Sequence, residues 1–439
     1  MPCSCSRHMI SMGSYPETLN RIYNLRGGVI DLRLDRMDRA LGLFGHPEKR
    51  FLSFHIAGTN GKGSSAAMLH RILTLAGYRT ALYTSPHLVS FTERIRVGNG
   101  EISPSEVVEL ADQVQARTVA AGLSLTFFEF VTVMAFIYFA RQQVDIAVVE
   151  VGLGGRLDAT NLVKPIVSVI TTISKDHEAY LGSDLLSIAR EKGGIIKSGV
   201  PVVVGALPEE VTNLIVGLAR GQRAPTYILG RDYKIFLKNT GVFDYTGIKQ
   251  NFNSVSLALQ GRHQTNNAGV ALAALEVASA AFPVSAAVLR EGLRTVVWPG
   301  RFEVMMHSPT VILDGAHNGE GVKALIEALR DYPMRGKVKL LFASMEDKDW
   351  RLMLQLLEPV VDEVVLTRVE MERSADPKSL SSYLKDRIRH RVIEDSRRAI
   401  RSLLDVARAD ETVLVAGSLY LLGEIRPVVE ELANLVRPA

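Results

Sequence analysis

Short apolar runs alternate along this chain with segments whose apolar residues recur at helical spacing. The runs predicted to be strands are 51–56, 80–83, 144–151, 166–172 and 200–204. The segments predicted to be helices between and around them include 32–44, 64–76 and 128–141. Nearly continuous apolar strands that alternate with helices are typical of a parallel sheet covered on both faces. The first part of the chain is therefore predicted to be a doubly wound α/β domain.

The pattern changes twice after residue 226. The segment 227–259 has short, polar strands interrupted by turns, which predicts a small antiparallel annex. A second α/β unit follows from Trp298, with its own alternation of apolar strands and helices. Its predicted strands are 311–313, 338–342, 363–367, 391–393 and 412–416. We therefore expect two domains, residues 1–297 and a Rossmann-like domain over residues 298–439.

Composition narrows the class of protein without deciding its function. The 439 residues carry a net charge of +4, too small for this length to indicate a nucleic-acid partner. The longest apolar segment, 127–140, is interrupted by Glu129 and is too short to cross a bilayer. The two cysteines, Cys3 and Cys5, favour a reducing cytoplasm. The first 20 residues lack the apolar core of a signal peptide, and Met1, Met9 and Met12 are alternative starts.

A glycine-rich loop joins the strand at 51–56 to the helix at 64–76. Glycines let backbone N–H groups approach a phosphate, and the N-terminus of the following helix favours an anion. A lysine in the loop supplies a cation for the β- and γ-phosphates, and a hydroxyl side chain can meet a metal or a phosphate. The alternative is an ordinary glycine-rich turn. We expect a nucleoside triphosphate to bind at Thr59, Asn60, Gly61, Lys62, Gly63 and Ser64.

Three further residues are candidate site residues, and one of them suits a metal. Glu150 ends the strand at 144–151, where a parallel sheet presents its ligands, and a carboxylate there can hold Mg²⁺. His177 follows the strand at 166–172, and Lys192 lies fifteen residues further on. The alternatives are a structural glutamate, a satisfied histidine and a solvated lysine, and spacing alone does not separate these interpretations.

Nine short motifs follow one another along the chain. In order, they are TNGKGS at 59–64, YTSPHL at 83–88, ERIRV at 93–97, EVGLGGRLDATN at 150–161, DH at 176–177, EK at 191–192, PGRF at 299–302, DGAHN at 314–318 and AGSLY at 416–420. Read together, these motifs resemble those of the folylpolyglutamate synthase family of the Mur ligase superfamily. The resemblance runs from about residue 19 to the C-terminus.

The resemblance implies the roles of individual residues. The loop around Lys62 binds ATP, and Asn267, Arg301 and Asp314 contact the same nucleotide. Ser85 and Glu150 bind one Mg²⁺, while His177 and Lys192, the latter modified to a carbamate, serve a second. Lys62, Lys192 and His317 are the implied catalytic residues.

The resemblance also implies the reaction. ATP phosphorylates a carboxylate, and an amine then displaces phosphate from the acyl phosphate to form an amide. Members with dihydrofolate synthase activity share three segments that this chain also has, so we favour the bifunctional type, acting as a monomer on dihydropteroate, folates, L-glutamate and ATP. The alternatives are a folylpolyglutamate synthase only, a UDP-muramoyl-peptide ligase and a nucleotide switch. The implied pterin-binding residues are Ile30, Asp31, Leu32, Thr126, Phe128, Leu157, Asp158 and Ala159.

Overall fold

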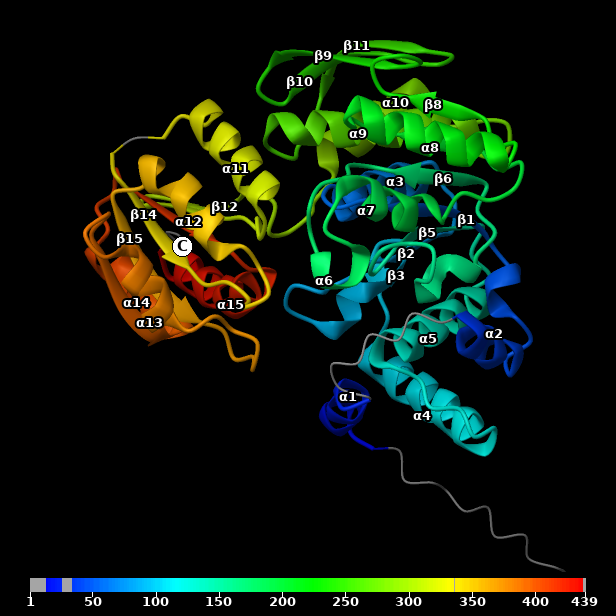
Figure 1. Ribbon diagram of the computed structural model, residues 1–439, viewed down its shortest axis with the longest axis horizontal. Helices are drawn as coiled ribbons and strands as arrows, with labels where there is room; N and C mark the ends of the chain where they lie inside the picture. Colours follow the sequence, from blue (N-terminus) through cyan, green and yellow to red (C-terminus); the bar gives the residue numbers. More distant parts are fainter. Residues whose placement is uncertain (1–12, 26–33, 335, 437–439) are drawn as a thin grey trace, which may run out of the picture.

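The computed structural model describes residues 13–25, 34–334 and 336–436, and it divides into two α/β units that lie side by side (Figure 1). The first unit is built on an eight-stranded sheet with the order β4-β3-β2-β5-β1-β6-β7-β8. Its strands are β1 (Leu52–Ala57), β2 (Thr80–Tyr83), β3 (Ile95–Val97), β4 (Gly100–Glu101), β5 (Ile146–Glu150), β6 (Val167–Ile170), β7 (Val202–Val204) and β8 (Thr226–Ile228). All neighbouring strands from β2 to β8 are parallel, whereas β3 and β4 form an antiparallel edge that the apolar pattern did not predict.

Helices cover both faces of this sheet, as the apolar strands require. One face packs against α3, α9 and α10, and the other against α4, α5, α7 and α8. The helices of this unit are α1 (Tyr15–Tyr23), α2 (Leu34–Gly42), α3 (Lys62–Leu75), α4 (Pro104–Ala120), α5 (Phe127–Arg141), α6 (Glu178–Leu181), α7 (Leu185–Gly193), α8 (Glu209–Gly221), α9 (Arg262–Ala278) and α10 (Ala286–Thr295). Short 3₁₀ turns occur at η1 (Pro47–Lys49), η2 (Phe91–Arg94) and η3 (Ala159–Leu162).

The predicted annex is a three-stranded antiparallel sheet with the order β11-β10-β9. It lies over α9 (Figure 1). Its strands are β9 (Lys234–Asn239), β10 (Val242–Thr246) and β11 (Asn251–Ser256). The expected annex range of 227–259 was too wide at its start, because most of β8 pairs in parallel with β7 in the main sheet.

The second unit has a six-stranded sheet with the order β12-β13-β17-β14-β15-β16. Its strands are β12 (Glu303–His307), β13 (Thr310–Leu313), β14 (Val338–Phe342), β15 (Glu363–Arg368), β16 (His390–Asp395) and β17 (Thr412–Ala416). Only β12, which the sequence did not predict, runs antiparallel to its neighbour.

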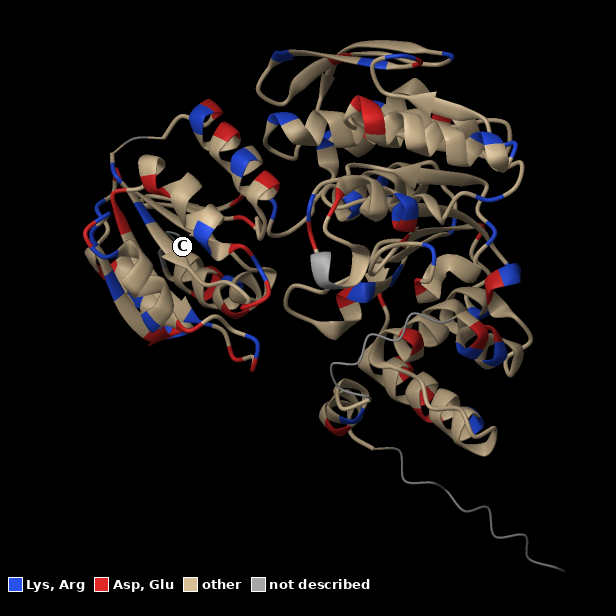
Figure 2. Ribbon diagram, in the orientation of Figure 1, with Lys and Arg blue, Asp and Glu red and all other residues tan. Residues whose placement is uncertain are grey.

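Two layers of helices cover the second sheet. One face packs against α11, α12 and α13, and the other against α14 and α15. These helices are α11 (Gly319–Asp331), α12 (Trp350–Leu357), α13 (Pro377–Leu384), α14 (Ser396–Val406) and α15 (Leu419–Val436), with a 3₁₀ turn η4 (Glu358–Val360). Acidic and basic residues are interspersed over both units (Figure 2). Within the described residues, no helix is both long and apolar enough to cross a membrane.

The annex is fixed to α9 by one buried carboxylate. Glu276, 5% exposed, accepts hydrogen bonds from the Tyr245 hydroxyl at 2.7 Å and from the backbone N–H groups of Ile248, Lys249 and Gln250 at 2.8, 3.2 and 2.7 Å. A carboxylate can accept all four bonds, because it has acceptor sites on two oxygens.

We expect Glu276→Gln to lower the free energy of unfolding by about 2 kcal/mol, because the amide NH₂ cannot accept and leaves buried donors unpaired. Urea denaturation followed by circular dichroism measures the change. The control is Glu291→Gln, which removes an exposed i,i+3 pair with Arg294 and should change stability by less than about 0.5 kcal/mol. Equal effects of the two variants would contradict the assigned role of Glu276.

Candidate active site

The phosphate loop has the backbone geometry that only glycine allows at two positions. Gly58 and Gly61 have φ values of +155° and +84°. A Cβ on Gly58 would lie 1.9 Å from the Thr171 hydroxyl, and a Cβ on Gly61 would lie 2.3 Å from Oδ1 of Asn267. The helix after the loop begins at Lys62, two residues earlier than the sequence predicted, with Gly61 as its N-cap. The free N–H groups of the first turn of α3 therefore face the site predicted to bind phosphate.

The segment that follows β6 holds this loop in place. The backbone N–H of Asn60 donates to the Thr172 hydroxyl at 3.0 Å, and its carbonyl accepts from the Thr171 hydroxyl at 2.7 Å. The Thr59 hydroxyl is already used, because it donates to the carbonyl of Ser174 and accepts from the N–H of the same residue, both at 3.1 Å. Among the loop residues, Ser64 is also buried, in the first turn of α3.

Glu150 ends β5 beside this loop and is 5% exposed. Its Oε1 lies 3.9 Å from Nζ of Lys62, and its Oε2 accepts the backbone N–H of Ser85 at 3.2 Å. Burial raises the pKa of Glu150 above its ordinary value, although Lys62 opposes the shift. The structure thus brings Lys62, Ser85 and Glu150 together, as the sequence predicted.

These residues suit a metal that is shared with a nucleotide. Within the described part of the chain, no cluster of three or more His, Cys, Asp or Glu side chains could hold a metal by itself. Mg²⁺ is usually bound by one or two protein oxygens together with water and substrate phosphates. The Glu150 carboxylate and the Ser85 hydroxyl provide oxygen donors of this kind.

Asp176 joins the two units through a polar cluster. Its Oδ1 lies 2.5 Å from Nζ of Lys348, and its Oδ2 lies 3.8 Å from Nε2 of His317 and 4.0 Å from Nε2 of His177. Asn318 donates to the same Oδ2 at 3.3 Å. Burial disfavours the charged carboxylate, yet Lys348 and the two histidines hold the pKa of Asp176 well below its ordinary value.

His317 and Lys192 lie at this junction, and the pKa of each is lowered by its surroundings. Desolvation, assisted by Lys348, lowers the pKa of His317 to about 4, and the Nδ1 atom of His317 lies 2.8 Å from the carbonyl of Gly315. Lys192 is 5% exposed and donates to the carbonyl of Gly58 at 2.9 Å. Desolvation, assisted by Lys62, lowers the pKa of Lys192 to about 7.

The predicted nucleotide contacts outside the loop come from both units. Asn267 on α9 is buried beside Gly61 and donates to the side chain of Gln264 at 3.0 Å. The buried carboxylate of Asp314 accepts the backbone N–H groups of Phe302 at 2.8 Å and Ala316 at 2.9 Å, which fixes the turn that carries Arg301. A small cavity at the junction is lined by Gly63, Thr84, Ser85, Pro86, His87, Leu88, Glu93, Arg96, Glu150, Trp298, Pro299, Arg301 and Leu419.

Among the described residues implied to bind a pterin, none lines this cavity. The Phe128 ring lies against Gly152, where a Cβ would be 2.4 Å from the ring, so Phe128 packs against the chain two residues after Glu150. Thr126 caps α5 and donates to Glu129 at 2.9 Å. The predicted residues Ile30, Asp31 and Leu32 lie outside the described residues.

Asp158 has a structural role that the sequence did not indicate. It is 3% exposed and caps η3, and its carboxylate accepts from the backbone N–H groups of Leu153 at 2.9 Å and Thr160 at 3.0 Å. Its neighbour Ala159 is buried and Leu157 is half-buried. The carboxylate of Asp158 therefore orders the loop after β5, whatever else it contacts.

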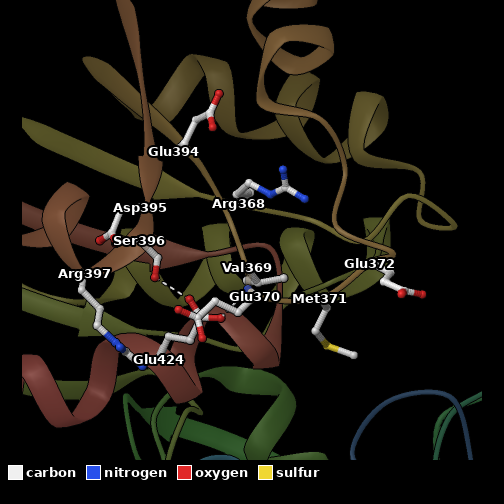
Figure 3. A pocket seen from close by; sticks show the side chains of 10 residues that line it. All are labelled: Arg368, Val369, Glu370, Met371, Glu372, Glu394, Asp395, Ser396, Arg397 and Glu424. Atoms are coloured by element: carbon white, nitrogen blue, oxygen red, sulfur yellow. Dashed lines mark hydrogen bonds between the residues drawn. The ribbon is translucent and has the colours of Figure 1, made fainter.

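A larger cavity, of about 420 Å³, lies elsewhere in the second unit (Figure 3). It is found where β15 and β16 end, and the Ser396 hydroxyl donates to Glu424 within it. Five carboxylates and two arginines line it, which disfavours a triphosphate anion. The lining residues are Arg368, Val369, Glu370, Met371, Glu372, Glu394, Asp395, Ser396, Arg397 and Glu424.

Sequence reasoning missed Lys348, Asn318 and Trp298 as residues of the junction. Lys348 stands in a run of charged residues, 346–349, which is typical of a solvated loop. Asn318 pairs with Asn60 through reciprocal side-chain hydrogen bonds of 3.1 and 3.3 Å. Only the docking of the two units brings these residues to the phosphate loop.

Family models match most of the chain. The model of the Mur ligase middle domain matches residues 56–275, and that of the Mur ligase glutamate ligase domain matches residues 300–419. The chain is 35% identical to the dihydrofolate synthase/folylpolyglutamate synthase of Bacillus subtilis (strain 168), covering 90% of this chain and 94% of the relative. It is 38% identical to the protein of the same name from Mycobacterium tuberculosis, covering 90% of each.

Solved structures agree with the sequence matches. The structure of E. coli FolC in complex with DHPP and ADP superposes with a TM-score of 0.88 at 33% identity, covering 95% of this chain and 98% of that one. The structure of a bifunctional folylpolyglutamate synthase/dihydrofolate synthase with Mn, AMPPNP and L-glutamate bound superposes with a TM-score of 0.85 at 32% identity, covering 96% of this chain and 98% of that one. The predicted two-domain α/β fold and the resemblance drawn from the motifs are confirmed, and the chain belongs to the dihydrofolate synthase/folylpolyglutamate synthase family of Mur ligases.

Proposed function

We propose that this chain is an ATP-dependent ligase that adds L-glutamate to dihydropteroate and to the glutamate tail of folates. The observation that carries this proposal is the meeting of the phosphate loop, Glu150 and Ser85 from the first unit with Arg301 and His317 from the second. The names and bound ligands of the relatives support the choice of substrates. We take residues 1–297 and 298–439 as the two domains.

The proposed reaction has two steps that this site can promote. A carboxylate oxygen of the acceptor attacks the γ-phosphorus of ATP, and the bond to the β-phosphate oxygen breaks to release ADP. The amine of L-glutamate then attacks the carbonyl carbon of the acyl phosphate, and inorganic phosphate leaves. Lys62 and Arg301 offset charge on the phosphoryl oxygens, and contact between the units keeps water from the acyl phosphate.

We assign the remaining roles from the same geometry. Neutral His317, with Asp176 near its Nε2 atom, accepts a proton from the attacking amine. Glu150 and Ser85 would hold one Mg²⁺, and His177 and a carbamate on Lys192 would hold a second. Such ions would neutralise phosphate charge.

Asn267 and Asp314 shape the nucleotide site, and Phe128, with Thr126 and the segment 157–159, forms the pterin site. We propose that the protein acts as a monomer in the cytoplasm, and the substrates and low cysteine content support the cytoplasm.

The test of the function is ADP release by the purified protein with ATP, Mg²⁺ and L-glutamate. We expect release with dihydropteroate and also with tetrahydrofolate. Release with tetrahydrofolate only would show a folylpolyglutamate synthase without dihydrofolate synthase activity. Release only with a UDP-muramoyl peptide would overturn the proposal.

We expect Glu150→Gln to lower kcat about 100-fold or more while the fold is kept, because the amide removes the anionic ligand of the proposed metal. Steady-state kinetics at saturating Mg²⁺ measures kcat, and thermal unfolding checks the fold. The control is Glu109→Gln on the exposed face of α4, which should leave kcat unchanged. Normal turnover of Glu150→Gln would show that Glu150 has only a structural role.

We expect Lys192→Ala to lose activity and to regain part of it in the presence of formate or acetate. The lowered pKa leaves much of the Lys192 amine neutral, which is the form that reacts with CO₂, and a small carboxylic acid can take the place of the resulting carbamate. The matched control is Lys197→Ala, because Lys197 also donates to a backbone carbonyl, that of Asn161 at 2.8 Å, but lies outside the junction. Density for an unmodified amine in a crystal grown with bicarbonate, Mg²⁺ and ATP would overturn the carbamate.

A further inference from the structure

A buried arginine in the first unit has no counterion. Arg94, at the end of η2, is 6% exposed. Its Nε atom donates to Nδ1 of His87 at 2.7 Å, and its guanidinium carbon lies 5.2 Å from the centre of the Phe127 ring. Among the described residues, no carboxylate lies within 4.0 Å of the guanidinium, and neither terminal nitrogen has a hydrogen-bond acceptor.

Two partly buried arginines of this chain are each paired with a carboxylate. Arg36 binds Glu129 through two nitrogens at 2.6 and 3.0 Å, and Arg426 binds Glu303 in the same way at 2.9 and 3.1 Å. An arginine that serves only the fold is expected to have such a partner, because a buried charge without one is destabilising. Burial lowers the pKa of Arg94, which reflects this cost. The missing partner of Arg94 is therefore expected to come from outside the chain.

The surroundings of Arg94 identify the kind of anion. His87 lines the junction cavity with Ser85, Glu150 and Arg301, and because its Nδ1 accepts from Arg94, its Nε2 carries the proton and is also a donor. Tyr23 stacks on Phe127 at 5.6 Å between ring centres and lies 6.4 Å from the His87 ring. Arg94 and His87 are thus two hydrogen-bond donors beside aromatic rings. This combination suits an aromatic carboxylic acid better than it suits a triphosphate.

We propose that Arg94, held in place by His87 and Phe127, binds a carboxylate of the acceptor substrate. The inference rests on the proposed function and adds a specificity-determining residue to it. The carboxylate has two possible sources, since dihydropteroate has only the carboxylate that reacts, whereas a folate has a second one on its terminal glutamate. His87, to which Arg94 donates, lines the same cavity as Glu150, so that either carboxylate would lie close to the proposed phosphoryl transfer.

The test compares Arg94→Met and Arg94→Lys with the wild-type protein. We expect Arg94→Met to raise the KM for the acceptor about 10- to 100-fold, with the KM values for ATP and L-glutamate unchanged, and Arg94→Lys to have a smaller effect. We also expect the Tm of Arg94→Met to stay the same or rise, because an unpaired buried charge is removed. A purely structural arginine would instead lower Tm. The control is Arg117→Met. Arg117 lies on α4, far from the junction, and its guanidinium also lies over an aromatic ring, that of Phe44.

The two acceptors distinguish the source of the carboxylate. A raised KM for both dihydropteroate and tetrahydrofolate identifies the reacting carboxylate, and a raised KM for tetrahydrofolate alone identifies the additional one. An unchanged acceptor KM, or a raised KM for L-glutamate only, would overturn the proposal. If Arg94→Met does not fold, the KM values of Arg94→Lys for the two acceptors are compared with those of the wild-type protein in the same way.

Calorimetric binding of each acceptor in the presence of ADP and Mg²⁺ separates this proposal from the proposed function. Wild-type protein that binds an acceptor without turning it over would refute the ligase activity only, and the Arg94→Met comparison would still stand. Wild-type protein that binds neither acceptor would refute both. Equal binding by wild-type and Arg94→Met protein would refute only the role of Arg94.

Discussion

The buried contact between Asp176 and Lys348 is the interaction on which the two-unit arrangement of this site depends. Asp176 follows β6 of the first unit, and Lys348 comes from the loop before α12 of the second. The same carboxylate accepts from Asn318, which also pairs with Asn60 of the phosphate loop. Separating this pair would leave the Asp176 carboxylate without a counterion in a site with little exposure to water. Because such a separation is costly, the pair holds the two units in their relative position. The position of His317 relative to the phosphate loop thus depends on this carboxylate.

Most of the fold could be predicted from the sequence because its strands are buried on both faces. Strands such as β14 (Val338–Phe342) and β17 (Thr412–Ala416) are wholly buried, and apolar runs mark their ends closely. The strands that were missed, β3, β4 and β12, lie at or next to sheet edges and are partly polar. Their pairing is decided by neighbours distant in sequence and not by their own pattern.

The candidate site was predictable to the extent that its residues belong to short motifs. Glycines at 58 and 61 indicate a phosphate loop because of the backbone they allow, and Glu150 is conspicuous as an acid at the end of an apolar strand. Lys348 has no such signal, since a lysine in a polar loop is usually solvated. Arg94 belongs to the ERIRV motif at 93–97, but that motif did not indicate a role for it. Their importance comes from burial and from partners that only the folded chain supplies. The same is true of Asp158, whose carboxylate turns out to order its own loop.

The linker between the units passes directly over the nucleotide loop. A Cβ on Gly63 would lie 3.0 Å from Nε1 of Trp298, so the indole rests against the first turn of α3. The chain has only one other tryptophan, Trp350, which is 7% exposed and lies inside the second unit. Indole fluorescence depends on the polarity and charge around the ring, and a triphosphate at this loop would bring charge next to Trp298. Trp298 would therefore report optically on a nucleotide bound at this loop, at the place where the two units join.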